Sequence, residues 1–164
     1  IAVVAIYMLG EDAHARFDAI HRKYEYHISQ EKSPFLIGKA WFNSRPVQLE
    51  LMNDAANLLI GYHDFEAFSK VKTEVNNFFC TISEAHFLPT DTGYVFHVQA
   101  NRFLRGMVRA LVGTLMDVGY GKIQISDFQD IIRSKNRQRA GSAAPAEGLY
   151  LTEVGYPIDY FKCK

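Results

Sequence analysis

Two stretches near the start of the chain have the apolar patterns of β-strands. Residues 1–8 are a continuous apolar run rich in β-branched side chains, which predicts a buried strand. Residues 22–29 alternate instead, so that Tyr24, Tyr26 and Ile28 share one face of a strand. That face must line either the core or a cleft.

Three further segments complete the predicted sheet. Residues 78–87 and 94–100 are aromatic and β-branched, and the sequence Leu-Pro-Thr-Asp-Thr-Gly between them predicts a hairpin. Residues 139–148 are rich in alanine, glycine and proline and predict a loop. Residues 149–157 then form the last predicted strand.

Helical spacing of apolar residues predicts three helices, over residues 46–60, 101–118 and 126–136. Gly61 and Gly119 stand where the first two should end, and Ser126 with Gln129 predicts a capping box at the start of the third. Strands interspersed with helices and joined by short connections predict one α+β domain over residues 1–164. In this fold, helices pack on one face of a mostly antiparallel sheet.

Composition excludes several classes of protein. The 164 residues are 48% hydrophobic and 22% charged, which allows a full core and excludes a disordered or low-complexity chain. No apolar run approaches the roughly 20 residues that span a bilayer, so we expect no membrane partner. The start lacks an initiator Met and a signal peptide, and we expect the chain to be a piece of a longer protein.

The net charge of zero hides a local asymmetry. Residues 101–139 contain eight Lys or Arg and three Asp, a net charge of +5, whereas residues 46–100 have a net charge of −5. A neutral chain can therefore still bind an anionic partner, because electrostatic fields act over roughly a Debye length. The alternative is that both segments are ordinary solvated faces.

The cysteines and histidines give no pattern of a metal site. Cys80 and Cys163 lie far apart, and the six histidines never occur at the spacing of zinc ligands. We therefore expect no zinc site and a reduced chain in the cytoplasm, with a single disulfide between the two cysteines as the alternative.

Three arginines mark one side of the longest predicted helix. Arg102, Arg105 and Arg109 lie at positions i, i+3 and i+7, in the same sector as Gly106 and Gly113. Glycine within a helix costs about 1 kcal/mol relative to alanine, so another backbone or a ligand should approach closely there. A solvated face with two packing glycines is the alternative.

Five stretches, in this order, resemble the carboxy-terminal catalytic domain of the bacterial tRNA pseudouridine synthase A family. They are HARF at 14–17, RKYEYHI at 22–28, GYHDFEAFSK at 61–70, ANRFLRGMVRALVGTLMDVG at 100–119 and APAEGLYLTEVGYP at 144–157. The resemblance implies an enzyme that isomerises uridine to pseudouridine in the anticodon stem-loop of tRNA. It also implies a homodimer that uses neither metal nor cofactor, and a sheet flanked by helices.

The resemblance also implies roles for individual residues. Tyr24 of the RxYxY motif stacks on the target base and helps with proton transfer, and Arg109 of the MVR motif pairs with the catalytic aspartate. A base that must leave the RNA stack needs an aromatic platform, and a catalytic carboxylate needs a cation that keeps it charged. For Tyr24, a core tyrosine with a satisfied hydroxyl is the alternative.

Other residues are expected to contact the substrate or support the site. Leu149 and Leu151 are similar to the apolar wall of the uracil pocket, and His14 and Arg16 match the HAR motif. Arg102 and Arg105, with the basic residues of 133–139, are expected to bind tRNA.

The sequence departs from the family at one decisive position. The family's catalytic aspartate lies in a GRTDxGVH motif, and this motif is absent from the sequence. We therefore expect the isolated chain to be inactive. The alternatives are a non-catalytic RNA-binding module of the same fold and a dimerisation domain without an RNA role.

Overall fold

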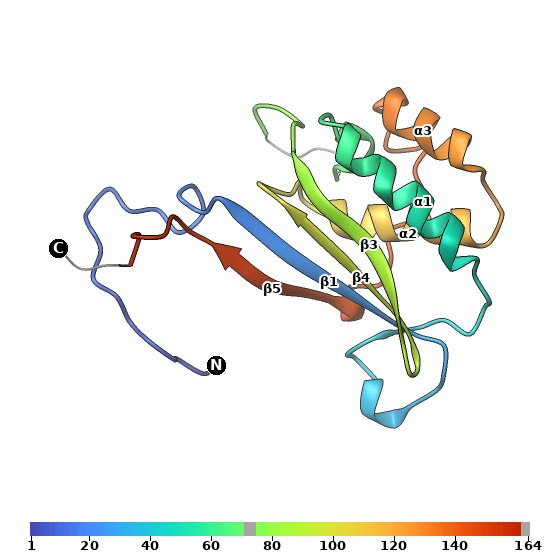
Figure 1. Cartoon of the computed structure of the whole chain (residues 1–164), viewed down its shortest axis with the longest axis horizontal. Coiled ribbons are helices and arrows are strands. Elements are labelled where there is room, and N and C mark those ends of the chain that lie inside the picture. The colour runs from blue at the N-terminus through green and yellow to red at the C-terminus, as the bar shows by residue number, and fades with distance from the viewer. Residues whose placement is uncertain (71–74, 162–164) are drawn as a thin grey trace.

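Strand β1 is the central strand of the sheet. The computed structural model describes residues 1–70 and 75–161, and these contain five strands (Figure 1). The strands are β1 (His21–Ser29), β2 (Trp41–Phe42), β3 (Ile82–Thr90), β4 (Gly93–Ala100) and β5 (Leu149–Gly155). On one side β1 pairs with β4, which in turn pairs with β3. On the other side β1 itself pairs with two strands, with β5 along residues 21–26 and with β2 at Ile28 and Ser29.

Every pairing except one is antiparallel among the described residues. The β3–β4 hairpin confirms the turn that the sequence predicts, with Thr90 opposite Gly93. Among the described strands only the short β2 runs parallel to its neighbour, with Trp41 opposite Ile28, and β2 is absent from the strands that the sequence predicts. The predicted mostly antiparallel sheet is therefore confirmed.

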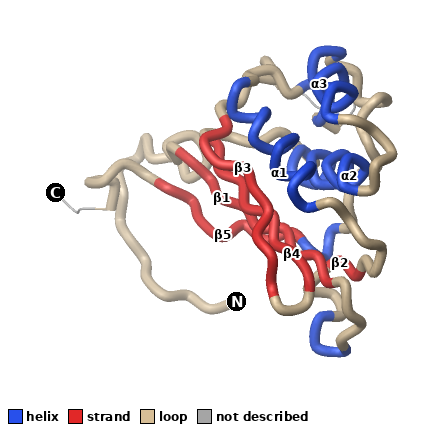
Figure 2. Tube along the Cα trace, turned by 45° about the vertical axis from the view of Figure 1, so that its right-hand side comes forward, coloured by secondary structure: helices blue, strands red, loops and turns tan. Residues whose placement is uncertain are grey.

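The helices cover a single face of the sheet, as Figures 1 and 2 show. They are α1 (Leu49–Leu58), α2 (Met107–Gly119) and α3 (Ile125–Ser134), with short 3-10 turns η1 (Pro34–Leu36), η2 (Leu59–Gly61), η3 (Glu66–Phe68) and η4 (Ala146–Gly148). Helix α1 packs on β3 and on α2, and α3 packs on both α1 and α2. The α+β prediction is confirmed. No helix in the described ranges is long and apolar enough to cross a membrane.

The core lies between the sheet and these helices. Tyr26, Phe96, Leu111 and Phe128 are among its largest fully buried side chains. They come from β1, β4, α2 and α3, so each layer contributes apolar area that folding removes from water.

The predicted strand over residues 1–8 is wrong. These residues form no strand, and their side chains are exposed. A strand requires hydrogen bonds to a neighbouring strand, and this segment makes none with the described sheet (Figure 1). The apolar run therefore lies outside the core.

The longest helix begins six residues later than predicted. Gly106 has a φ of +77°, a left-handed conformation that ends the loop, and α2 starts at Met107. The helical stripe of three arginines is therefore wrong, because Arg102 and Arg105 lie in the preceding loop. Gly113 does mark a close approach, since a Cβ there would lie 1.8 Å from the carbonyl oxygen of Ser142.

The third helix also has a different cap from the predicted one. Gln124 is its N-cap, and Gln124 and Asp127 form the capping box. The helix begins one residue earlier than expected, so Ser126 already lies within its first turn.

Candidate functional site

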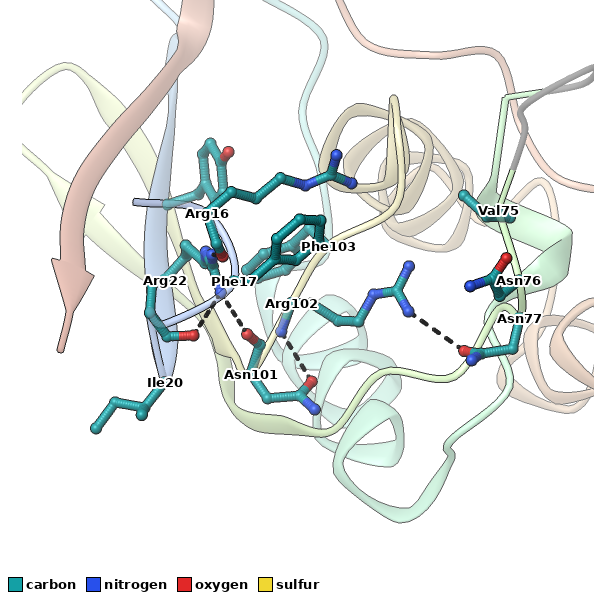
Figure 3. Close-up of a pocket in the computed structure, with 12 residues that line it drawn as sticks. Arg16, Phe17, Ile20, Arg22, Val75, Asn76, Asn77, Asn101, Arg102 and Phe103 are labelled. Atoms are coloured by element: carbon teal, nitrogen blue, oxygen red, sulfur yellow. Dashed lines mark hydrogen bonds between the residues drawn. The ribbon is translucent and has the colours of Figure 1, made fainter. Parts of the chain in front are cut away.

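A cavity of about 660 Å³ opens where β1 begins and β4 ends. Its wall comes from three separate parts of the chain, residues 16–24, 75–77 and 101–103 (Figure 3). Among the described residues, the wall contains Arg16, Arg22 and Arg102 but no carboxylate. Because no described lining side chain neutralises these cations, the described wall of the cavity favours an anionic ligand.

Tyr24 lines this cavity at the margin of the core. Two and four positions further along the same face of β1, Tyr26 and Ile28 are buried, whereas Tyr24 is half-buried. The Tyr24 ring meets Phe103 edge-on, with the ring centroids 5.1 Å apart and the planes at 85°. This contact orients the ring. The tyrosine-bearing face of β1 thus lines the core and the cleft together.

Arg22 holds the wall of the cavity together. Its Nη1 donates to the carbonyl oxygens of Ala19 and Asn101, at 2.9 Å each. Its Nη2 donates to the carbonyl oxygen of Arg16. These bonds join the start of β1 to the segment after β4 and to the turn that carries Arg16. The guanidinium of Arg22 is therefore committed to the protein.

Arg16 and Arg102 retain donors for a ligand. Nη1 of Arg102 lies 3.3 Å from Oδ1 of Asn77, across the cavity (Figure 3). The guanidinium of Arg16 lies 5.4 Å from the ring centroid of Phe17 and makes no hydrogen bond within the described part of the chain. Both cations can therefore form charge-assisted hydrogen bonds to an entering phosphate.

His14 supports the turn that carries Arg16 rather than lining the cavity. Its Nδ1 accepts hydrogen bonds from the backbone amides of Arg16 and Phe17, at 3.1 and 3.3 Å. The His14 amide donates to Oδ2 of Asp18 at 2.7 Å, and Tyr160 donates to the same oxygen. Both bonds favour the charged carboxylate and therefore lower the pKa of Asp18. The bond from the His14 amide contributes most to this shift.

Arg109 is half-buried in the first turn of α2 and does not line the cavity. Its Nε donates to the carbonyl oxygen of Ala144 at 2.5 Å, and the Ala144 amide donates back to the Arg109 carbonyl at 2.9 Å. No carboxylate of residues 1–70 or 75–161 pairs with the guanidinium, so a backbone carbonyl fills the place expected for an anion. Its two terminal nitrogens, Nη1 and Nη2, have no partner there.

Tyr26 connects Arg109 to the sheet. Its hydroxyl donates to the carbonyl oxygen of Pro145 at 2.6 Å. Burial raises the pKa of Tyr26 above its ordinary value, the charge of Arg109 opposes that rise, and Glu147 adds to it. The charge of Arg109 therefore acts on Tyr26, which lies two residues after Tyr24 on the same face of β1.

The remaining expected site residues lie around the cavity rather than in its wall. Leu151 pairs with Tyr24 and Leu149 with Tyr26 across the β1–β5 ladder. Leu151 is 51% exposed, whereas Leu149 is half-buried and packs against the core. Arg105 is exposed in the loop before α2 and lies outside the lining residues.

Most of the basic residues in 133–139 are already engaged within the protein. Lys135 lies 2.6 Å from Oδ2 of Asp64, and Nη1 of Arg137 donates to carbonyl oxygens of the following loop. Arg133 is exposed and lies 3.7 Å from Asp130, and Arg139 is exposed. This cluster therefore offers fewer free charges than its composition suggests.

Sequence reasoning missed three contributors to the cavity. Arg22 occurs in the RxYxY motif but carried no expected role, Phe103 lay within the helix predicted over residues 101–118, and Asn77 had no signal at all. Their convergence depends on strand register, with Arg22 opposite Ala100. Only the position of Arg22 two residues before Tyr24 could have drawn attention to it.

The structure places no cluster of metal ligands in the part of the chain it describes. No group of three or more His, Cys, Asp or Glu residues in that part could hold a metal ion. Cys80 is a buried free thiol, and burial raises its pKa to about 11. Cys163 lies outside the described residues.

The family model and the similar proteins that match this chain all carry the name of one enzyme family. The family model described as tRNA pseudouridine synthase matches residues 55–157. A tRNA pseudouridine synthase A from Porphyromonas gingivalis is 53% identical over 152 residues, which cover 92% of this chain and 60% of the relative. One from Bacteroides fragilis is 44% identical, with 99% and 65% covered, and one from Staphylococcus aureus is 38% identical, with 94% and 59% covered.

The chain thus spans about 60 to 65% of the length of the first two of these relatives. The matched region includes α2 with Arg109, the loop before β5 and all of β5. The alignments with the relatives extend the similarity over nearly the whole chain. This chain therefore belongs to the tRNA pseudouridine synthase family.

Proposed function

We propose that this chain forms the larger part of an enzyme that isomerises uridine to pseudouridine in the anticodon stem-loop of tRNA. The cavity with Tyr24 and three arginines in its wall supports this most directly. A nucleotide drawn out of an RNA loop presents a flat base and a phosphate. An aromatic ring binds the first and guanidinium groups bind the second.

Tyr24 stacks on the target base once that base has left the RNA stack, and Phe103 keeps its ring in place. Arg16 and Arg102 bind the neighbouring phosphates with the donors that the protein leaves available. His14 and Arg22 hold these groups in position, while Arg105 extends the basic surface outside the cavity. Leu149 and Leu151 form the apolar wall beside the base.

Arg109 pairs with the catalytic aspartate, which comes from a part of the protein outside these residues. The bond from Nε to Ala144 fixes the guanidinium and leaves Nη1 and Nη2 for a bidentate pair with a carboxylate. The carboxylate attacks C1′ of the ribose, or stabilises the charge there, while the bond from C1′ to N1 of uracil breaks. C5 then bonds to C1′, and any bond between C1′ and the carboxylate oxygen breaks, which frees the carboxylate again. C5 gives its proton to water, and N1, which left with the electron pair of the broken bond, takes up a proton from water.

The proposal includes the wider expectations from the sequence. Residues 1–164 act as one domain of a cytoplasmic homodimer, which needs neither metal nor cofactor. The aspartate in its GRTDxGVH motif belongs to a segment that this sequence does not contain.

The test measures tritium released from tRNA labelled at C5 of uridine. The protein from the full open reading frame should release tritium, and residues 1–164 alone should remain at background because they lack the nucleophile. Tyr24→Ala should abolish release, and Lys135→Ala, which changes a residue already paired with Asp64, should not. If the full-length protein binds tRNA but releases no tritium, it is a non-catalytic RNA-binding module. Turnover by the isolated chain would contradict the assignment of the nucleophile.

A further inference from the structure

The loop before β5 crosses α2 in close contact. We call residues 141–148 the strap. The Gly141 amide donates to Oγ1 of Thr114 at 2.9 Å, and Ala144 exchanges two hydrogen bonds with Arg109. A Cβ at Gly113 would lie 1.8 Å from the Ser142 carbonyl oxygen, so the strap lies directly against the helix backbone.

Tyr26 holds the other side of the strap from within the core. Its side chain is completely buried, and its hydroxyl donates to the carbonyl oxygen of Pro145 at 2.6 Å. A Cβ at Gly148 would lie 2.9 Å from Cζ of Tyr26 and 2.6 Å from the carbonyl oxygen of His27. The strap therefore lies in a fixed position between β1 and α2, and the phenol contributes a directional bond to it.

The position of the strap determines the position of several site residues. It leads directly into Leu149, which pairs with Tyr26, and two residues later Leu151 pairs with Tyr24. It also supplies the Ala144 carbonyl that orients the Arg109 guanidinium. A shift of the strap would move the apolar wall and the arginine together, while leaving Arg16 and Arg102 in place.

We infer that Tyr26 is a positioning residue for the isomerisation, an inference that rests on the proposed function. Its hydroxyl acts through the strap to align Arg109 with the catalytic carboxylate and to hold Leu149 and Leu151 beside the base. Small displacements of such groups have large effects on rate, since a misplacement of about 1 Å can cost about a hundredfold. Binding of tRNA phosphates should not depend on Tyr26.

Tyr26→Phe removes the hydroxyl and keeps the ring. In the protein from the full open reading frame, kcat for tritium release should fall at least about tenfold, while KM for tRNA changes less than about twofold. Hydrogen exchange at the amides of Gly141 and Ala144 should become at least about tenfold faster, because the strap opens more often. Tyr150→Phe is the matched control, since the hydroxyl of this exposed tyrosine donates to the carbonyl oxygen of Lys39 at 2.7 Å and makes no hydrogen bond to the strap residues that the structure describes.

The two readouts separate a positioning role from a purely structural one. If exchange in the strap accelerates while kcat stays at the wild-type value, Tyr26 serves the fold alone and the inference is wrong. If neither changes, the hydroxyl does not hold the strap, and the inference is wrong as well. A wild-type protein that releases no tritium overturns the proposed function first, and this failure is recognised before any variant is measured.

Discussion

Replacing Gly113 by alanine tests how closely the strap lies against α2. The added Cβ would lie 1.8 Å from the carbonyl oxygen of Ser142, 3.0 Å from its carbonyl carbon and 3.3 Å from the amide nitrogen of Ala144. All three are backbone atoms, so no side-chain rotation can relieve the overlap. Ordinary van der Waals contact begins near 3.4 Å, and the strap must therefore move by about 1.6 Å.

A displacement of this size breaks the two hydrogen bonds between Arg109 and Ala144, of 2.5 and 2.9 Å. Their loss costs about 2 to 3 kcal/mol, since one of them has a charged donor. Alanine in place of glycine inside a helix returns about 1 kcal/mol. The free energy of unfolding should therefore fall by about 1 to 2 kcal/mol.

Urea denaturation followed by the fluorescence of Trp41 measures this change. Trp41 is the single tryptophan of the chain, and it packs against Tyr26 with ring centroids 6.4 Å apart. Gly61→Ala is the control, because nothing lies within 4 Å of a Cβ there, and its effect should stay within about 0.5 kcal/mol. If Gly113→Ala proves as stable as this control, the close contact between the strap and the helix does not exist in solution.

Three further predictions follow from the site. Arg102→Ala should reduce the slope of log tRNA affinity against log salt concentration by about 0.7 to 0.9 in filter binding, as expected for one phosphate contact, while Lys135→Ala leaves the slope unchanged. Asp18 has a pKa below its ordinary 3.8, so its contribution to stability is complete above that pH and is lost as the pH falls through the lower, folded-state value. Asp18→Asn should remove this part of the acid dependence of urea unfolding. Arg109→Lys should lower kcat for tritium release at least about tenfold with tRNA binding retained, because an ammonium group cannot form a bidentate pair with a carboxylate.

For each of these three predictions, one experimental outcome would contradict it. An unchanged salt slope for Arg102→Ala would remove the cavity from the path of the RNA. An unchanged acid profile for Asp18→Asn would mean that the turn over residues 14–18 contributes nothing through its carboxylate. Wild-type turnover by Arg109→Lys would exclude a bidentate pair between this arginine and the nucleophile.

The fold could be predicted where the signal was local. Alternation located β1 to within one residue, and the hairpin between β3 and β4 followed from the turn sequence between two aromatic segments. The start of α2 could not be predicted, because the apolar spacing continues through Phe103 and Leu104. Only the left-handed conformation of Gly106 separates loop from helix, and glycine is compatible with both.

The error over residues 1–8 has a different origin. A β-branched apolar run indicates a strand that prefers burial, but it carries no information about which strand it pairs with. No strand of the described residues pairs with residues 1–8, so this segment has the sequence pattern of a strand but does not form one.

The candidate site was predictable only in part for a related reason. Tyr24 was recognised because its motif is contiguous, whereas its contact with Phe103 joins residues far apart in the sequence. Arg16 and Arg102 share the cavity wall because β1 and β4 align Arg22 with Ala100. Such convergence follows from strand register and helix placement, which no short segment specifies.

The late position of β5 in the chain has a consequence for how the protein is made. The bond from Tyr26 to Pro145 joins residues 119 positions apart, and closing so long a loop is slow. On the ribosome, a nascent chain that has completed α3 but not residues 149–155 exposes one edge of β1, where β5 will later pair. An exposed strand edge is a template for aggregation. Synthesis of the last strand therefore ends the period in which the central strand of the sheet is open to incorrect pairing.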